Sequence, residues 1–584
     1  MKTVIMTILL NPKKHKRYYP DAKSKDIMLK TIEFFENKGR AKIKEDDRKR
    51  VWYSDFLEFQ KENKLFAHLL TPAQYGEDEN YRWDTWRICE FNEILGFYGL
   101  SYWYTWQVSI LGLGPIWMSK NVKAKEKAAK LLKEGAIFAF GLSEQAHGAD
   151  IYGTEMALTP QEDGSYRANG EKYYIGNGNE AEMVSNFGKF ADKDGNIPPY
   201  DMKNKEQYVF FVANYKHKNY ELIKNVCDSQ NYVANFALHD YPITEEDILS
   251  KGEDAWNSSL NTVNVGKYNL GWASIGLCTH AFYEAIHHAS YRRLYNMYVT
   301  DFQHVKQNFV DAYTRLVAMK LFGLRTADYM RIASSKDRRY LLYAPAMKMK
   351  TTTQGEEVIN LLWDVIAAKG FEKDMFFESA ARDIRALPKL EGTVHVNIAL
   401  ILKFMMNFFM NHKKYEEIPR QDQAKDDTFL FNQGPTRGLG RVRFHGWKPA
   451  FEQYNLPNVK IFLEQIKLFN LMGVKAMPSI EQQKDMDFML SGIGEIFSLI
   501  VYAHLIVENS KIYDIDEDTI DQIFDFLVRD FSKYALNLYN KSSTTPEQME
   551  WCLKMIKKPN VDPERFGKVW NIVHSLKDAY EMNE

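Results

Sequence analysis

Cysteine is scarce in this sequence, and there is almost no excess of positive or negative charge. The 584 residues include only four cysteines, without the spacing of a disulfide framework or a metal site: Cys89, Cys227, Cys278 and Cys552. We therefore expect free thiols and a reducing, cytoplasmic location. The net charge of −1 gives no electrostatic reason to expect a nucleic acid as partner.

The sequence also lacks a clear membrane span. The apolar segment 4–10 is short and is followed, not preceded, by basic residues, so it does not resemble a secretory signal. We take Ile398–Met410 as the longest later apolar run, and Lys403 and Asn407 interrupt it. It is too short to cross a bilayer, so we expect no transmembrane helix and a core or interface helix here. Peripheral membrane contact is the minority alternative.

Hydrophobic patterning predicts a mostly α-helical chain with an inserted β domain. From about residue 24 to 134 the pattern is helical, as in the recurrence of Ile27, Leu29, Ile32 and Phe35. Strand and turn signals dominate from 136 to 249, and helical periodicity returns from 256 onward. We expect four domains: an N-terminal helical domain (1–135), a middle β domain (136–255), a C-terminal helical bundle (256–413) and a helical extension (414–584).

Local signals refine this outline. In the β domain, Thr159–Gly164 has turn chemistry, Val209–Val212 is a buried-strand candidate, and Asn169-Gly170 predicts a two-residue hairpin turn. Three helices are expected in the bundle, at 270–291, 305–333 and 356–368. The polar stretch 413–440 predicts a long surface connection to the extension.

One carboxylate, Glu391, is the first candidate for chemistry. The segment around it runs Arg-Asp-Ile-Arg-Ala-Leu-Pro-Lys-Leu-Glu-Gly-Thr over residues 382–393. A carboxylate beside an apolar residue and a glycine turn is expected to be partly desolvated, which raises its pKa and makes it a stronger base.

A second candidate region opens the β domain. Gly141–Asp150 reads Gly-Leu-Ser-Glu-Gln-Ala-His-Gly-Ala-Asp, and small residues there let backbone amides approach a flat ligand closely. Tyr174 follows downstream beside a Gly-Asn-Gly turn, where an aromatic face suits stacking against a heteroaromatic ring. Each segment alone also fits an ordinary β-hairpin.

Taken in order, these motifs resemble the acyl-CoA dehydrogenase family over roughly residues 25–410. Gly141–Asp150 is similar to the family's Thr-Glu-Pro-x-Ala-Gly-Ser-Asp stretch, and Tyr173–Asn177 to its Trp-Ile-Thr-Asn stretch. Arg292 with Tyr295 and Gln303 resembles the Arg-x-x-Phe-Gly…Gln pattern, and Arg382-Asp383 precedes Glu391 at the family spacing. The additional C-terminal helices resemble those of longer members of the family.

The resemblance implies FAD as cofactor and an acyl-CoA thioester as substrate, with a role in fatty acid metabolism. Glu391 would remove the α proton while a hydride passes to flavin N5, and no metal would take part. The implied cofactor contacts are Leu142, Ser143, Tyr174, Gly176, Arg292, Gln303 and Thr393, and the implied substrate contacts are Ala149, Asn264 and Lys267. Electrons would pass to an electron-transfer flavoprotein, and the protein would be a homodimer or a dimer of dimers.

The sequence departs from the family pattern at several cofactor positions. Gly176 replaces a Thr near flavin N5, Ala149 replaces a Ser, and Asp364 with Ala367-Ala368 stands where a Gln…Gly-Gly is common. These departures keep open a non-catalytic binding protein with this fold, and a third alternative is an acyl-CoA oxidase that uses O₂. His280, Glu284 and His288 share a helical face and could ligate a metal, but such groups are more often solvated or satisfied in a core.

Overall fold

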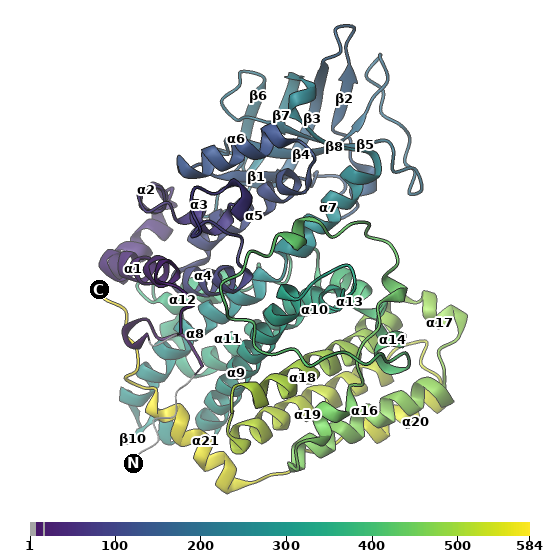
Figure 1. Ribbon diagram of the computed structural model, residues 1–584. Helices are drawn as coiled ribbons and strands as arrows, with labels where there is room; N and C mark the ends of the chain where they lie inside the picture. Colours follow the sequence, from purple (N-terminus) through teal and green to yellow (C-terminus); the bar gives the residue numbers. More distant parts are fainter. Residues whose placement is uncertain (1–7, 16–17) are drawn as a thin grey trace. The chain divides into compact units, whose positions relative to one another are not determined.

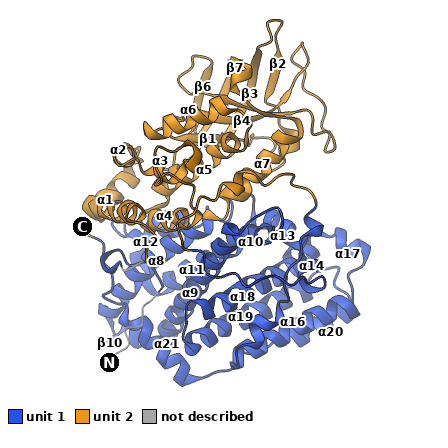
Figure 2. Ribbon diagram, viewed as in Figure 1, with its two compact units in different colours: residues 1–17, 270–421, 438–582 blue, residues 18–269, 422–437, 583–584 orange. Residues whose placement is uncertain are grey.

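A computed structural model describes residues 8–15 and 18–584 in two compact units, which we describe separately (Figure 2). The sheet unit contains Tyr18–Asn269, Asp422–Arg437 and Asn583–Glu584. The helical unit contains Leu270–Gln421 and Gly438–Met582 together with residues 8–15. Most of the apolar segment at 4–10 and the end of the basic run at 16–17 lie outside the described residues. The four-domain division remains a prediction.

The N-terminal part of the sheet unit is helical, which confirms the prediction for residues 24–134. Its helices are α1 (Ala22–Lys49), α2 (Ser54–Glu62), α3 (Leu65–Leu70), α4 (Thr85–Tyr98), α5 (Leu100–Met118) and α6 (Val122–Lys133). Ile27, Ile32 and Phe35 of α1 are buried, whereas Leu29 is 37% exposed and lies off the buried face of this helix. Helix α5 is buried along almost its whole length and packs on the sheet.

The β prediction is also confirmed, as one mixed sheet with the order β6-β7-β3-β2-β4-β5-β8, in which β1 pairs in parallel with β4. Figure 1 shows these strands together, followed in the chain by α7 (Gly252–Gly266). The strands are β1 (Phe138–Gly141), β2 (Ala157–Pro160), β3 (Tyr166–Gly176), β4 (Met183–Phe190), β5 (Tyr208–Ala213), β6 (Tyr220–Asn225), β7 (Val233–Ile243) and β8 (Ile248–Lys251).

One turn prediction is confirmed and another is wrong. The chain reverses between β2 and β3, where Gln161 N donates to Ser165 O. Asn169 and Gly170, in contrast, lie inside the long strand β3 and form no hairpin. Gly170 has a φ of +142°, and a Cβ there would lie 3.0 Å from the Met156 backbone. The glycine therefore serves close packing against a neighbouring segment, which a local turn rule does not detect.

The helical unit begins with the predicted bundle. Its helices are α8 (Asn269–Tyr291), α9 (Gln303–Arg331), α10 (Tyr340–Ala346), α11 (Thr352–Ile366), α12 (Phe376–Asp383), α13 (Val394–Leu402) and α14 (Met405–Phe409). A π-helical segment, η6 (Met347–Thr351), joins α10 to α11. A short hairpin of β9 (Arg293–Leu294) and β10 (Met297–Tyr298) lies between α8 and α9. The run Ile398–Met410 forms two short helices, α13 and α14, rather than one.

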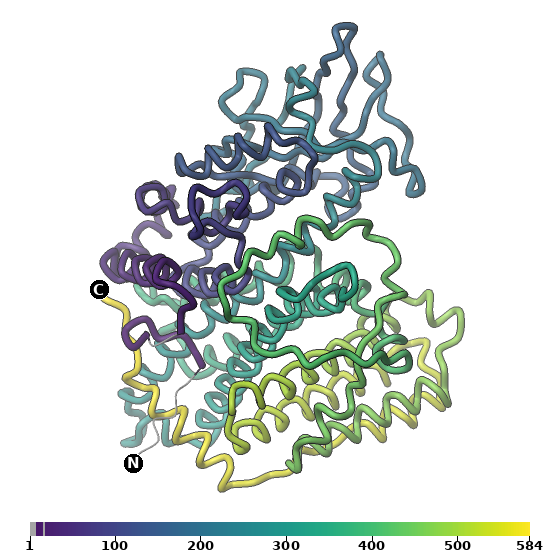
Figure 3. Tube along the Cα trace, in the orientation of Figure 1, coloured from purple at the N-terminus to yellow at the C-terminus, as the bar shows by residue number. Residues whose placement is uncertain are grey.

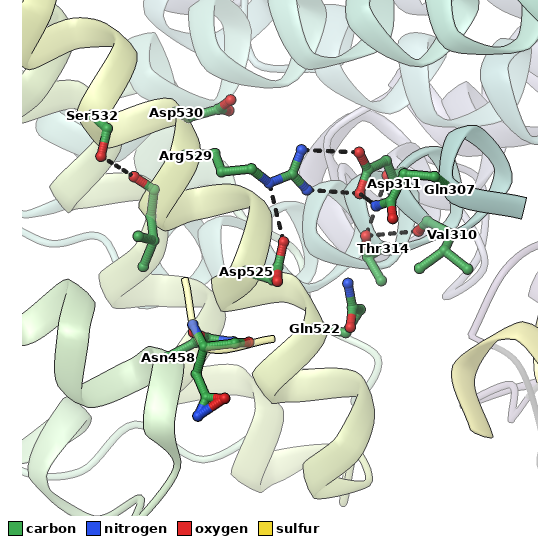
Figure 4. A network of polar contacts seen from close by, with 12 residues as sticks. Gln307, Val310, Asp311, Thr314, Asn458, Gln522, Asp525, Arg529, Asp530 and Ser532 are labelled. Atoms are coloured by element: carbon green, nitrogen blue, oxygen red, sulfur yellow. Dashed lines mark hydrogen bonds and ion pairs between the residues drawn. The ribbon is translucent and has the colours of Figure 1, made fainter. Parts of the chain in front are cut away.

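The C-terminal extension completes the same unit. It consists of α15 (Lys448–Glu452), α16 (Pro457–Lys475), α17 (Ile480–Lys484), the π-helical η10 (Asp487–Gly494), α18 (Glu495–Ile512), α19 (Glu517–Tyr539), α20 (Pro546–Met555) and α21 (Pro563–Ser575). Helices α18 and α19 pack against α9 of the bundle. Figure 4 shows one polar link between them, where Arg529 of α19 donates to both oxygens of Asp311 on α9, at 2.7 and 3.0 Å.

The connection before the extension is irregular, as predicted, but it is not only a surface segment. Figure 3 follows it in green from the end of α14 to the start of α15. Leu430 and Phe431 are buried, and Phe431 contacts Trp83 edge-to-face within the sheet unit at a centroid distance of 4.7 Å. Apolar side chains inside this polar stretch therefore anchor it.

The prediction about apolar runs needs a correction. The helical segment Asp487–Ile512 spans 26 residues with a mean hydropathy of 1.8, long and apolar enough to cross a membrane by length and composition. It exceeds the run Ile398–Met410 that we took as the longest. Since 83% of its most apolar window is buried inside the protein, packing in the bundle accounts for its composition.

Candidate functional site

In the sheet unit, a bulge near the end of β3 turns an aromatic side chain outward. The pairing of β3 with β7 shifts register between Lys172 and Ile175. Tyr174 in this bulge has a φ of +63°, a conformation that costs free energy for a residue with a side chain. Its ring is 61% exposed and meets Tyr173 edge-to-face. The bulge thus presents an aromatic face, at the position that the sequence indicated.

Leu142 and Ser143 lie beside this bulge. Ser143 Oγ donates to Tyr173 O at 2.7 Å, and Tyr173 N donates to Ser143 O at 3.0 Å. Lys172 Nζ donates to Leu142 O at 3.2 Å. The structure therefore brings Leu142, Ser143 and Tyr174 together, although the Ser143 hydroxyl donates to backbone.

A buried ion pair that sequence reasoning missed fixes this corner. Lys172 Nζ lies 2.6 Å from Glu144 Oε1, and the Lys172 side chain has no exposed surface. Burial alone would raise the pKa of Glu144, but the Lys172 ammonium outweighs it and lowers the pKa. Glu144 also accepts from Thr154 Oγ1 and Glu155 N. Because each of these groups is satisfied inside the protein, the pair holds the β1–β3 corner rigid.

The structure explains why residue 176 is a glycine where the family pattern has a threonine. A Cβ at this position would lie 2.7 Å from both Tyr104 Cε1 and Val108 Cγ1 of α5. The next residue, Asn177, is fully buried and donates to Thr105 O and Phe138 O, each at 3.0 Å. This tight junction of β3 and α5 leaves no room for the Thr that the family pattern has.

The three predicted substrate contacts lie on two different elements of the sheet unit. Ala149 is exposed in the turn after β1. Asn264 is half-buried on α7, and Lys267 caps the C-terminal end of that helix with 3% of its surface exposed. Their assignment to a substrate stays a prediction.

In the helical unit, Glu391 lies in a turn with unusual backbone conformation. Glu391 has a φ of +52° and Gly392 a φ of +88°, so two consecutive residues are left-handed. Thr393 then caps α13 by accepting from Val396 N at 3.4 Å. The Glu391 side chain is half-buried. Non-glycine residues in this region concentrate at functional sites, where the surrounding structure imposes the conformation.

Lys348 contacts this turn, and sequence reasoning did not single it out. Its Nζ donates to Pro388 O at 2.7 Å and to Gly392 O at 2.5 Å, on both sides of Glu391. Lys348 has no exposed surface. The segment Ala-Met-Lys-Met-Lys gives no local signal that its lysines are buried, so only the tertiary structure reveals the burial of Lys348.

Arg292 and Gln303 lie on either side of the β9–β10 hairpin. Arg292 follows α8, and Gln303 is the first residue of α9. The turn residue Tyr295 is 89% exposed with a φ of +53°. The predicted cofactor roles of Arg292 and Gln303 remain untested.

Ala367, which stands where the family pattern has a glycine, adopts a backbone conformation that is unfavourable for alanine. Its φ is +54°, the left-handed region that the glycine of the family pattern adopts without penalty.

Two clusters of histidine and glutamate fit no metal site. Glu284 accepts from the backbone N–H groups of Phe376 and Phe377, so it caps α12, while His280 stacks on Phe376 at a centroid distance of 3.7 Å. Burial lowers the pKa of His288 to about 4.

The second cluster comprises His445, His504 and Glu508. Arg339 Nη1 lies 3.1 Å from His445 Nδ1, and an arginine can only donate. The His445 proton is therefore on Nε2, which donates to Glu508 Oε1 at 3.0 Å. This tautomer leaves His445 no free lone pair for a metal ion.

Comparison with known proteins agrees with the fold. Residues 254–406 match the model of the family described as acyl-CoA dehydrogenase, C-terminal domain. A 3-(aryl)acrylate reductase of Clostridium sporogenes is 24% identical over 299 residues, covering 50% of this chain and 75% of that protein. The caffeyl-CoA reductase–Etf complex subunit CarC of Acetobacterium woodii is 24% identical over 54% of this chain and 80% of its own length.

Among solved structures, an acyl-CoA dehydrogenase complexed with FAD from Bacillus anthracis has a TM-score of 0.71. At 16% identity it covers 98% of this chain and 96% of that chain. The match therefore includes the C-terminal extension, and it confirms the predicted fold class.

Proposed function

We propose that this chain is a member of the acyl-CoA dehydrogenase family that uses FAD to interconvert an acyl-CoA thioester and its α,β-unsaturated form, with Glu391 as base. The observation that carries the proposal is the left-handed backbone of Glu391 beside Gly392, inside the matched domain. A carboxylate in such an imposed conformation is a stronger candidate than any of the solvated carboxylates around it.

The residues of the sheet unit fit a flavin. The exposed Tyr174 ring offers a stacking surface, and Ser143 lies beside it with its hydroxyl oxygen able to accept one more hydrogen bond. Within residues 8–15 and 18–584, the Ser143 N–H has no hydrogen-bond acceptor in the protein. When bound, FAD supplies the two-electron acceptor that the β carbon requires.

The chemistry assigned to this chain's residues is proton transfer. The α proton of a thioester is weakly acidic, so its removal requires a positioned base and a hydrogen-bond donor to the thioester oxygen. Glu391 takes the proton on its carboxylate, and its own backbone N–H is the donor in the family pattern. In the reverse direction the same carboxylate returns the proton to the α carbon.

The direction of the reaction and its electron partner belong to the proposal as well. Two relatives carry the names of reductases, and one of these names includes an Etf complex. We propose an electron-transfer flavoprotein as partner, because its potential then decides between oxidation and reduction of the same bond. An acyl-CoA oxidase is the runner-up, and stoichiometric hydrogen peroxide with enoyl product would favour it.

We also propose a homodimer, or a dimer of dimers, that lies in the cytoplasm. Exposed apolar and aromatic side chains on and around the β9–β10 hairpin are suited to burial against a second copy: Tyr291, Leu294, Tyr295, Met297 and Tyr298. All four cysteines are free, as a reducing compartment requires.

The test is replacement of the base in the purified holoenzyme. Glu391→Gln should keep its flavin colour but lose flavin reduction by acyl-CoA by about 10² to 10⁴-fold, because an amide cannot accept the proton. Glu372→Gln, at an exposed carboxylate of the same unit, is the matched control and should reduce normally. A colourless wild type that cannot be reconstituted with FAD would instead favour a non-catalytic binding protein.

A further inference from the structure

Lys348 is a buried lysine whose ammonium donates to two backbone carbonyls. Its Nζ lies 2.7 Å from Pro388 O and 2.5 Å from Gly392 O, and these two carbonyls flank the Glu391 turn. An ammonium that donates to neutral carbonyls in a core makes short, charge-assisted hydrogen bonds. Burying a lysine is costly, so its retention inside this unit needs a reason.

The π-helical segment η6 explains how Lys348 reaches the turn. A π-helix changes the angular spacing of side chains, and such segments occur frequently at functional sites. Lys350, two residues further along η6, is equally buried but donates to Tyr534 OH of α19 at 2.7 Å. One short segment thus sends one lysine to the Glu391 turn and the other to the extension.

A second side chain holds the same turn. Asn397 Nδ2 on α13 donates to Gly392 O at 3.0 Å and to Thr393 O at 2.9 Å, and Asn397 is fully buried. Gly392 O therefore accepts from both Lys348 and Asn397. Two independent donors on one carbonyl fix the orientation of the Gly392–Thr393 peptide, one residue beyond Glu391.

We propose that Lys348 is a positioning residue for Glu391. It offsets the unfavourable left-handed backbone of the turn through the carbonyls on either side, so that the Glu391 carboxylate and N–H face the substrate correctly. The inference rests on the proposed role of Glu391. Without the Lys348 ammonium the turn relaxes, and the base moves away from a productive distance.

The test compares variants of the FAD-loaded protein. Lys348→Met keeps the length and apolar stem but removes the donor, and Lys350→Met is the matched control in the same π-helical segment. In Lys348→Met we expect the limiting rate of flavin reduction by acyl-CoA to fall by about 100-fold. The dissociation constant of the acyl-CoA should change by less than about threefold, since only a contact that matters in the transition state is lost. Lys350→Met should keep both values within about threefold.

A second readout does not depend on activity. Hydrogen exchange of the backbone amides at residues 390–393 should become faster in Lys348→Met and stay unchanged in Lys350→Met, because only the first variant releases the turn. If Lys348→Met does not fold, Asn397→Leu removes the other donor to Gly392 O. It should likewise lower the limiting rate of flavin reduction while the dissociation constant of the acyl-CoA stays nearly unchanged.

The outcomes separate this inference from the proposed function. If Glu391→Gln is inactive but Lys348→Met keeps the wild-type limiting rate, the positioning role is overturned. Where Lys348→Met fails to fold, the same conclusion follows from a wild-type rate in Asn397→Leu. Equal losses in Lys348→Met and Lys350→Met also overturn it, since the effect would then be general packing of η6. A fully active Glu391→Gln overturns the proposed function, and the positioning role with it.

Discussion

Glu391 occupies a backbone conformation that its own side chain does not favour. Its φ is +52°, and donors from η6 and α13 hold the carbonyls of the same turn. The sequence indicated the carboxylate and the glycine after it, because both are local. It could not indicate Lys348 or Asn397, whose roles depend on helices that come close only in the folded chain.

A residue-scale prediction concerns His504. It is fully buried, and within the described part of the chain neither ring nitrogen has a hydrogen-bond partner. Burial lowers its pKa from 6.5 to about 3, so the folded protein keeps it neutral while the unfolded chain binds a proton. The free energy of unfolding therefore decreases as the pH falls below 6.5, because the unfolded chain takes up the proton more readily than the folded protein.

His504→Leu should be at least as stable as the wild type at pH 7 and should resist acid better. Between pH 7 and pH 5 the free energy of unfolding of the wild type should fall by about 2 kcal/mol more than that of the variant, as measured by denaturant titration. His304→Leu, at an exposed histidine, is the control. An identical pH dependence in wild type and His504→Leu would contradict the prediction.

At the scale of elements, strand β3 shows where local sequence rules succeed and where they fail. The turn before it followed from its Asp-Gly chemistry, and the position of Tyr174 followed from its motif. The same kind of rule wrongly predicted a hairpin at Asn169-Gly170. It failed because a close approach of the Met156 backbone also requires a glycine, and a local rule cannot tell this cause from a turn. The bulge that exposes Tyr174 has no sequence signature of its own.

An element-scale prediction tests the packing of β3 on α5. Gly176→Ala places a Cβ 2.7 Å from Tyr104 and Val108, so we expect a loss of about 1–3 kcal/mol in stability. Gly567→Ala is the matched control, since Gly567 lies in α21 with no atom within 4 Å of its would-be Cβ. The control should gain about 0.5–1 kcal/mol from helix propensity.

Thermal or denaturant unfolding of the two variants measures both effects. If Gly176→Ala is as stable as the wild type, β3 and α5 adapt to the added methyl group. The glycine would then need a different explanation.

At the scale of the whole chain, the extension is part of the helical unit rather than an appendage to it. Arg315 of α9 contacts Asp530 of α19 through two hydrogen bonds, at 2.8 and 3.0 Å. The helical periodicity of α19 was visible in the sequence. Its buried partner on α9 was not, because the pairing joins residues far apart in the chain.

The Arg315–Asp530 pair gives a prediction with a defined pH window. Burial alone would raise the pKa of Asp530, but the Arg315 guanidinium outweighs it and holds the pKa at about 2. The stabilisation is therefore present above pH 3.8, the ordinary value, and is lost as the pH falls toward 2. Asp530→Asn should cost about 3 kcal/mol at pH 7, because it leaves the Arg315 charge buried without its counter-ion.

Denaturant unfolding at pH 7 measures this cost. Asp254→Asn, in an exposed pair with Lys120, should leave the stability unchanged. If the two variants behave alike, the buried pair does not hold the extension to α9.

The most direct measurement is flavin reduction in the purified holoenzyme without added acceptor, followed against a panel of acyl-CoA esters. We predict that at least one ester bleaches the flavin of the wild type, and that Glu391→Gln stays yellow with the same ester. Bleaching of Glu391→Gln at the wild-type rate would contradict the account.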